Sequence, residues 1–393
     1  AKGIIEIKNK FLFTNLSKYE LYWCQCSDKG IISDGVVNVD IKPFEKKVVD
    51  LELGKLPKTE YYLNLELREK DDTAYCKAGH IVAEQQFVIN EFDNVYDEIE
   101  EEQQLLVDDT YGSLRIISDD VVIRFERRER NQLYSIKVGN EELLQAPMRL
   151  NFWRALTDND RGTRAGSRLG CWRDAGDTPG IFNNTKWSIE GYKILDDGKK
   201  VVVTSGATVC TQPESKASIV YTITSKGMEI NLHFYPDPSL PEIPEVSLLF
   251  ELPKDFENVT YLGNGPEENY IDRANAAKIG LYNTTVSDMW VDYLKPQECG
   301  NRTGVRYATL VGDKKVFSLV AEPVMEFNAC HWLPKEIENV WHQKDLPEPN
   351  KTVVRCIARQ QGIGGYDSWG AHCNEKYKNK TDKTYRLKFQ IRF

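Results

Sequence analysis

Apolar residues in the first 92 positions recur with a period of two, in short runs separated by turn residues. Leu63, Leu65 and Leu67 form one such run, and residues 27–30 and 70–73 are polar clusters that favour turns. A period of two places alternate side chains on one face of a strand. Residues 1–92 are therefore predicted to form a β-sandwich close to an immunoglobulin-like domain.

Residues 93–110 interrupt this pattern with an acidic sequence, DNVYDEIEEEQQLLVDDT, which has little apolar periodicity. Such a shift in composition is typical of segments between domains. We predict a linker here.

Alternation returns after residue 110 and continues to the end of the chain. Residues 385–393 place Tyr, Leu, Phe, Ile and Phe on one face of a strand and Arg, Lys, Gln and Arg on the other. A single sheet of this length would leave one apolar face in water, so residues 111–393 are predicted to form a large antiparallel two-layer sandwich. The fold class is all-β, and no stretch alternates strands and helices as a (β/α)₈ barrel requires.

The amino-acid composition disfavours some classes of binding partner. The formal net charge of −9 disfavours nucleic acids and anionic membranes, because those contacts depend on Lys and Arg. No apolar run approaches the roughly 18 residues that span a bilayer, so we expect a soluble protein without a membrane partner. The nine cysteines lack zinc-type spacing, although Cys24 and Cys26 stand one residue apart, and they are expected to be mostly free thiols.

Two segments combine bulky aromatic residues with Asp, Asn and Gly: NFWRALTDNDRG at 151–162 and GIGGYDSW at 362–369. Glycines let the second segment bend sharply and hold Trp369 at the edge of a sheet, where an indole can stack on the apolar face of a sugar. Since tryptophan is usually well buried, a core position is the alternative.

The first of these segments is expected to continue as a glycine-rich loop. Asp158 and Asn159 precede Gly162 and Thr163 there, and more glycines follow. The acidic spacing lacks the glutamate and the remaining oxygens of a calcium loop, so no metal is assigned. Arg154 is expected to hydrogen-bond the DND turn because it lies close by in sequence.

Together with YLGNGPEENYIDR at 261–273 and YLKPQECGNRTGVRY at 293–307, the two segments resemble four signatures of the C-terminal small-chain domain of glycoside hydrolase family 2 β-galactosidases, in the same order. The resemblance covers nearly the whole chain. It implies that residues 1–92 are the immunoglobulin-like domain that follows the catalytic barrel in this family. It also implies that residues 111–393 are the family's supersandwich.

The resemblance also implies a substrate-binding surface. Trp369 would stack on the sugar, and Asp158 and Asn159 would lie beside it. Gly162 would be the hinge of a mobile loop whose moving part begins at Thr163, although the later sequence of this loop departs from the family pattern. No catalytic residue is assigned, because adjacent acids such as Glu267 and Glu268 point to opposite faces of a strand, and their motif is expected to be structural.

The implied function is that of the non-catalytic C-terminal portion of a retaining β-galactosidase. A catalytic TIM barrel, in cis or in trans, would be its partner, a galactoside its substrate, and the chain alone should be inactive. This chain needs no cofactor, while magnesium and a monovalent cation would bind in the barrel. A bacterial cytoplasmic or periplasmic location would suit such an enzyme.

Two alternatives remain open. One is a natural small subunit of a two-chain β-galactosidase; the abrupt start and the additional N-terminal domain favour a segment of a longer polypeptide instead. The other is a free-standing carbohydrate-binding or adhesion module. That module would show sugar affinity without any barrel.

Overall fold

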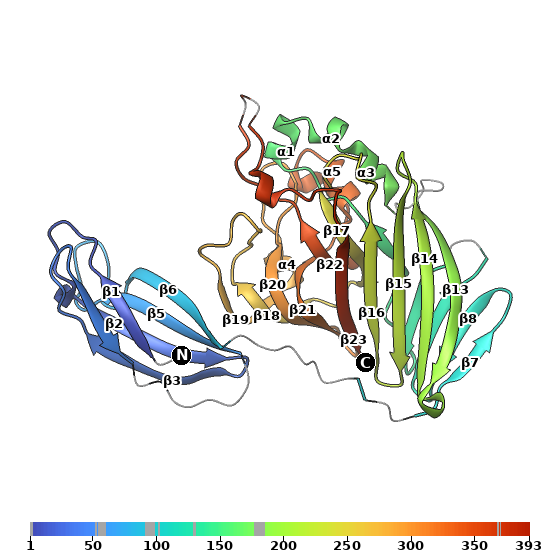
Figure 1. Cartoon of the computed structure of the whole chain (residues 1–393), viewed down its shortest axis with the longest axis horizontal. Coiled ribbons are helices and arrows are strands. Elements are labelled where there is room, and N and C mark those ends of the chain that lie inside the picture. Colours follow the sequence, from blue (N-terminus) through green and yellow to red (C-terminus); the bar gives the residue numbers. More distant parts are fainter. Residues whose placement is uncertain are drawn as a thin grey trace. The chain divides into compact units, whose positions relative to one another are not determined.

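The computed structural model describes residues 3–51, 53, 60–90, 99–100, 103–128, 131–176, 185–367, 369 and 371–393. The chain divides into two compact units. Unit 1 comprises Ala1–Val95 with Lys278–Leu281, and unit 2 comprises Tyr96–Ala277 with Tyr282–Phe393. Both units are built mainly from antiparallel strands, which confirms the all-β class (Figure 1).

Unit 1 contains two sheets. Strands β1 (Ile4–Lys8) and β4 (Lys46–Asp50) form one pair, and the other sheet has the order β3 (Gly30–Asn38), β2 (Tyr19–Ser27), β5 (Tyr61–Glu69), β6 (Ile81–Asn90). Side chains from both sheets share one apolar core, with Val49 from the pair and Leu21 and Leu63 from the larger sheet. This two-layer packing follows from the alternation noted in the sequence.

Unit 2 has a smaller sheet of five strands. Its order is β11 (Glu141–Glu142), β10 (Leu133–Val138), β9 (Val121–Glu126), β8 (Ser113–Ile117), β7 (Leu106–Asp109). Strand β7 corrects the predicted linker, because residues 106–109 pair with β8 instead of connecting domains. The apolar run at residues 105–107 is too short to stand out from the acidic sequence around it. Residues 93–98, 101 and 102 of that linker lie outside the described residues.

The larger sheet of unit 2 has twelve strands. Its main path runs β12 (Ala146–Asn151), β17 (Glu245–Pro253), β22 (Lys351–Gln360), β21 (Val316–Cys330), β23 (Tyr385–Arg392), β16 (Gly227–Tyr235), β15 (Ser215–Thr224), β14 (Lys200–Val209), β13 (Thr185–Leu195). Strands β18 (Asn258–Gly265), β19 (Lys278–Thr285) and β20 (Arg302–Val311) join it through β21. The predicted amphipathic strand at the end of the sequence is β23, an interior strand of this sheet.

The two sheets of unit 2 share one large apolar core. Phe125 of the smaller sheet meets Tyr221 of the larger one edge to face, with ring centroids 5.0 Å apart. Short helices α1 (Asp158–Gly162), α2 (Ala165–Arg168) and α3 (Gly170–Ala175) lie at the same end of unit 2 as the segment that follows β22 (Figure 1). Two further short α-helices in the described residues are α4 (Val286–Met289) and α5 (Pro334–Glu338). Among the described residues, no helix is both long enough and apolar enough to cross a membrane.

Candidate functional site

A buried arginine joins the two aromatic segments. The guanidinium of Arg154, only 1% exposed, donates to both carboxylate oxygens of Asp160 at 3.0 and 3.1 Å. It also donates to the backbone carbonyl oxygens of Gln361 and, at 3.2 Å, Gly362. Burial opposes the charge of Arg154, but the Asp160 carboxylate raises its pKa above the ordinary value. The expected contact between Arg154 and the DND turn is confirmed.

The DND segment is a helix, which corrects the expectation of a loop. Thr157 caps α1: its hydroxyl accepts a hydrogen bond from the backbone N–H of Asp160, and the Asp160 carboxylate accepts one from the backbone N–H of Thr157, both at 3.1 Å. This reciprocal capping box satisfies amides that would otherwise lack partners at the helix start. Asp160 thus caps the helix and neutralises Arg154 with the same carboxylate.

The four predicted contact residues of this segment lie on or beside α1. Asn159 donates from its side-chain amide to the carbonyl oxygen of Ile363 at 2.8 Å. Asp158 is exposed and pairs with Arg161 at 3.0 Å. Thr163 donates to the carbonyl of Asp160 at 3.1 Å, and open space surrounds the position where Gly162 would carry a Cβ. The left-handed backbone position in this stretch is Arg164, with φ of 55°, whereas Gly162 lies inside the helix.

Trp369 projects into solvent, with 92% of its surface exposed. Asp367 fixes the turn before it by accepting from the backbone amides of Trp369 and Ala371, both at 2.9 Å. Asp367 thus stabilises the turn, while Ser368 lies outside the described residues. Trp153, by contrast, is 4% exposed and donates from its indole nitrogen to Glu338 at 2.7 Å, as expected for a core tryptophan.

Asp272 secures the base of the loop that carries Trp369. Its carboxylate accepts from the backbone amides of Ile363 at 3.1 Å and Gly364 at 2.7 Å. A Cβ on Gly362 would lie 2.7 Å from this carboxylate, so a glycine is needed for close approach. Gly365, with φ of 82°, is needed for its left-handed conformation.

The other two signature segments have structural contacts. Glu268 accepts from the Tyr293 hydroxyl at 2.6 Å and from the backbone amide of Gly300 at 2.8 Å. Gln297 donates to the carboxylate of Asp158 at 3.2 Å. All four segments that carry the family resemblance therefore meet at one end of unit 2.

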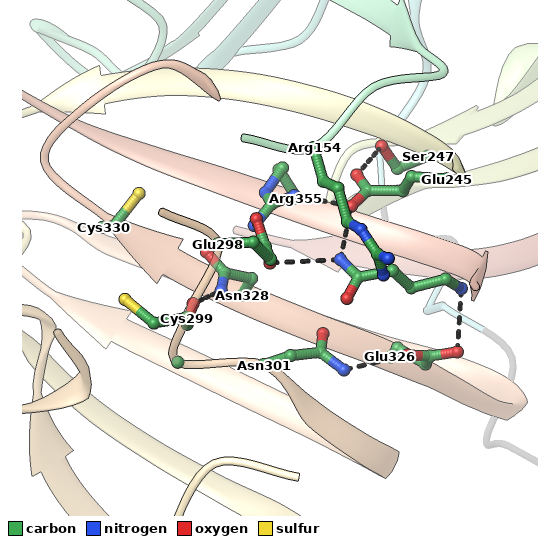
Figure 2. Close-up of polar contacts among 12 residues, drawn as sticks. Arg154, Glu245, Ser247, Glu298, Cys299, Asn301, Glu326, Asn328, Cys330 and Arg355 are labelled. Atoms are coloured by element: carbon green, nitrogen blue, oxygen red, sulfur yellow. Dashed lines mark hydrogen bonds and ion pairs between the residues drawn. The ribbon is translucent and has the colours of Figure 1, made fainter. Parts of the chain in front are cut away.

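Beneath the four signature segments lies a buried polar network that sequence reasoning did not find. Figure 2 shows Arg355, 2% exposed, between the carboxylates of Glu245 and Glu298, which it contacts at 2.5 and 2.6 Å. The side-chain amide of Gln360 donates to both carboxylates, at 2.7 and 3.1 Å. The partners are far apart in sequence and share no motif, so no local pattern could have found them.

A third acid, Glu326, lies next to this network. It accepts from the backbone amide of Gln360 at 3.0 Å and from the side chain of Asn301 at 2.9 Å (Figure 2). Burial raises the pKa of Glu298 and raises that of Glu326 to about 7. Because these carboxylates are buried and held by internal partners, they cannot flank a glycosidic bond from outside. The network is best explained as support for the surface above it.

Two family profiles match this chain. The profile described as "Beta galactosidase small chain" matches residues 118–391, and that described as "Beta-galactosidase, domain 4" matches residues 5–90. These ranges correspond to most of unit 2 and most of unit 1.

Individual proteins with similar sequences are also β-galactosidases or their subunits. A β-galactosidase of Priestia megaterium is 31% identical over 100% of this chain and 38% of its own length. A β-galactosidase of Streptococcus thermophilus is 28% identical over 98% of this chain and 37% of its own length. A β-galactosidase small subunit of Latilactobacillus sakei is 26% identical over 72% of this chain and 99% of its own length. The chain thus spans less than two fifths of the longer relatives.

The small-chain profile alone covers more than half of the chain, and it includes all four segments that converge around Arg154 and Asp272. This chain therefore belongs to the β-galactosidase small chain family.

Proposed function

We propose that this chain is the non-catalytic C-terminal portion of a β-galactosidase and that it completes a sugar site on a separate catalytic barrel. The observation that carries the proposal is the exposed indole of Trp369 on a loop anchored to the DND segment. An exposed aromatic ring on a firmly held base offers a flat apolar face that a ligand can cover without any rearrangement of the loop. A galactose ring with an apolar face fits this surface, since aromatic rings bury such faces well.

The positions of the carboxylates in this chain indicate which part of the enzyme supplies the catalytic groups. Retaining hydrolysis requires two carboxyl groups about 5 to 5.5 Å apart on either side of the bond. Glu245 and Glu298 are buried around Arg355, and Glu268 is held by Tyr293 and Gly300. We therefore assign the acid/base and the nucleophile to the barrel. Trp369, Asp158, Asn159, Gly162 and Thr163 are assigned to the surface that faces the substrate.

The metal ions of such an enzyme are assigned to the barrel as well. Within the part of the chain that the structure describes, no group of three or more His, Cys, Asp or Glu side chains could hold an ion. Asp158 faces Arg161 and Gln297, so its oxygens already have partners.

The test joins this chain to the catalytic region of the P. megaterium relative, in place of that relative's matched segment. The chimera should hydrolyse a chromogenic β-galactoside, and the isolated chain should not. Trp369→Ala in the chimera should raise KM roughly tenfold or more, because stacked aromatic anchors contribute about 2 kcal/mol. Trp341→Ala, which removes another exposed indole of unit 2, is the matched control and should leave KM unchanged. Robust turnover by the purified chain alone would contradict the proposal.

A two-chain arrangement is the second candidate. The L. sakei small subunit, which aligns over 99% of its length, favours it because a region like this one exists there as a separate chain. If the partner acts in trans, mixing this chain with a separately purified catalytic region should restore activity. An adhesion module is disfavoured, since one stacked ring gives little affinity by itself; calorimetry with galactose should detect no binding by the chain alone.

A further inference from the structure

Two cysteine thiols meet on the outer face of the larger sheet in unit 1. Cys24 and Cys26 lie two positions apart on β2, so their side chains point to the same side, opposite to Leu21 and Trp23 in the core. The pairing of β2 with β3 shifts register between Gln25 and Cys26. Such a bulge re-aims the side chain next to it. The two sulfur atoms are 3.5 Å apart.

A side-chain amide holds the pair in place. Asn64 lies opposite Cys24 on β5, and its Nδ2 atom lies 3.7 Å from the sulfur of Cys24 and 3.5 Å from that of Cys26, as a donor to both. Gln86 of β6 donates to the Oδ1 atom of Asn64 at 2.8 Å, which orients this amide with its nitrogen toward the sulfurs. Three strands thus contribute to one small polar cluster.

The cluster favours one negative charge. The hydrogen bond from Cys26 is the largest effect on Cys24 and lowers its pKa to about 6, whereas the pKa of Cys26 is raised. The pair therefore favours a single thiolate held between the two sulfurs, and the thiolate is the form that binds metals and attacks electrophiles. Cys26 is partly exposed, which gives small reagents access from the solvent side.

The spacing suits a bridging atom better than a disulfide. Two thiolates on one tetrahedral ion, with bonds of about 2.3 Å, lie about 3.8 Å apart, close to the observed 3.5 Å. A disulfide would need the sulfurs at about 2.05 Å and Cα atoms within about 6.8 Å, while positions i and i+2 of a strand are about 6.6 Å apart. Such a disulfide would lie at the long end of that range and would need the two sulfurs to approach by roughly 1.5 Å, whereas a bridging centre fits the spacing already present.

We propose that Cys24 and Cys26 form a dithiol site that binds one thiophilic metal or metalloid centre through both sulfurs. Soft thiolate ligands select such centres over the hard cations that carboxylates bind. All residues of this site belong to unit 1, so the proposal does not rest on the sugar surface proposed for unit 2.

Phenylarsine oxide is the probe for metalloid binding, and it is tested on the full chain. It forms two As–S bonds and releases its oxygen as one water, which takes both thiol protons. Mass spectrometry should find one phenylarsenic group per chain, on the peptide that contains both cysteines. Cd²⁺ is the probe for the metal arm and should give a thiolate-to-cadmium absorption band in the ultraviolet.

Cys24→Ser and Cys26→Ser should each weaken binding of either probe roughly 100-fold or more, because the second sulfur acts at a high effective concentration. Cys76→Ser, which removes another partly exposed thiol of unit 1, is the matched control and should bind like the wild type. Cys299 and Cys330 should not compete, since burial raises the pKa of both thiols. Circular dichroism checks that the serine variants fold.

Peptide mapping of the wild type needs no variant and decides the question directly. An adduct on any other cysteine, no adduct at all, or binding that survives loss of Cys24 would overturn the proposal. Binding by only one of the two probes would restrict the site to a metal or to a metalloid.

Discussion

The side-chain amide of Asn159 donates a hydrogen bond of 2.8 Å to the backbone carbonyl of Ile363, which lies 204 residues further along the chain. Arg154 binds the two preceding carbonyls, those of Gln361 and Gly362. Three consecutive carbonyl groups are therefore held by one short segment, partly at the surface and partly in the interior. The loop that carries Trp369 starts from a fixed base.

Removing the carboxylate of Asp272 should loosen this base. Asp272→Ala deletes the acceptor for the amides of Ile363 and Gly364, and the expected cost is about 1–3 kcal/mol of unfolding free energy. Urea denaturation measures this cost, and limited proteolysis should show faster cleavage within residues 362–374. Asp272→Asn keeps one acceptor oxygen and should give an intermediate loss. Equal stability of the alanine variant and the wild type would refute the anchoring role.

Substitution of Arg154 should lower the unfolding free energy more than substitution at most other positions of unit 2. Arg154→Met leaves the Asp160 carboxylate buried without its partner, so unfolding should become easier by about 3–5 kcal/mol. The control is Arg161→Ala, which breaks the more exposed pair with Asp158 and should cost no more than about 1 kcal/mol. Chemical denaturation of both variants checks the contrast, and a similar loss in the two would argue against it.

The two signature tryptophans should differ in what their removal does. Trp153→Ala empties a buried position and should cost about 3–5 kcal/mol. Trp369→Ala removes an exposed ring and should change the unfolding free energy by less than about 0.5 kcal/mol. Thermal melting of the isolated chain compares them. A large shift for Trp369→Ala would mean that its ring contributes to folding and not only to a binding surface.

Glu326 should make stability depend on pH. Burial raises its pKa from 4.5 to about 7, so between these values the folded chain keeps a proton that the unfolded chain has lost. The free energy of unfolding should then fall as the pH rises through this window, since the folded state binds more protons. The stabilisation that the protonated Glu326 carboxyl contributes is fully present below about pH 4.5 and is lost above about pH 7.

Glu326→Gln imitates the protonated carboxyl and isolates this effect. The stability difference between the variant and the wild type should change by roughly 3 kcal/mol across the window, in favour of the variant at the higher pH. Urea denaturation at several pH values measures it. Glu214→Gln changes an exposed acid and serves as the control, with a difference that stays constant. A constant difference for Glu326→Gln as well would show that its carboxyl is ionised throughout.

Local patterns explain which parts of the molecule were predictable. The alternation at 385–393 identified β23 because strand periodicity depends only on neighbouring residues. The helix at Asp158–Gly162 was missed although Thr157 and Asp160 carry the spacing of a capping box, a signal that could have been used. The pairs of Arg355 with Glu245 and Glu298 join residues 110 and 57 positions apart. Contacts of that range leave no trace in a local pattern.

The place of β23 in the sheet bears on how the chain is made. It pairs with β16 on one side and β21 on the other, and in the described residues no other strand pairing joins the two halves of the twelve-stranded sheet. During translation the two halves can therefore join into one sheet only after Tyr385–Arg392 has left the ribosome. Until then their open edges are exposed to the pairing with other chains that leads to aggregation, so a chaperone that shields nascent sheet edges would raise the yield of this protein.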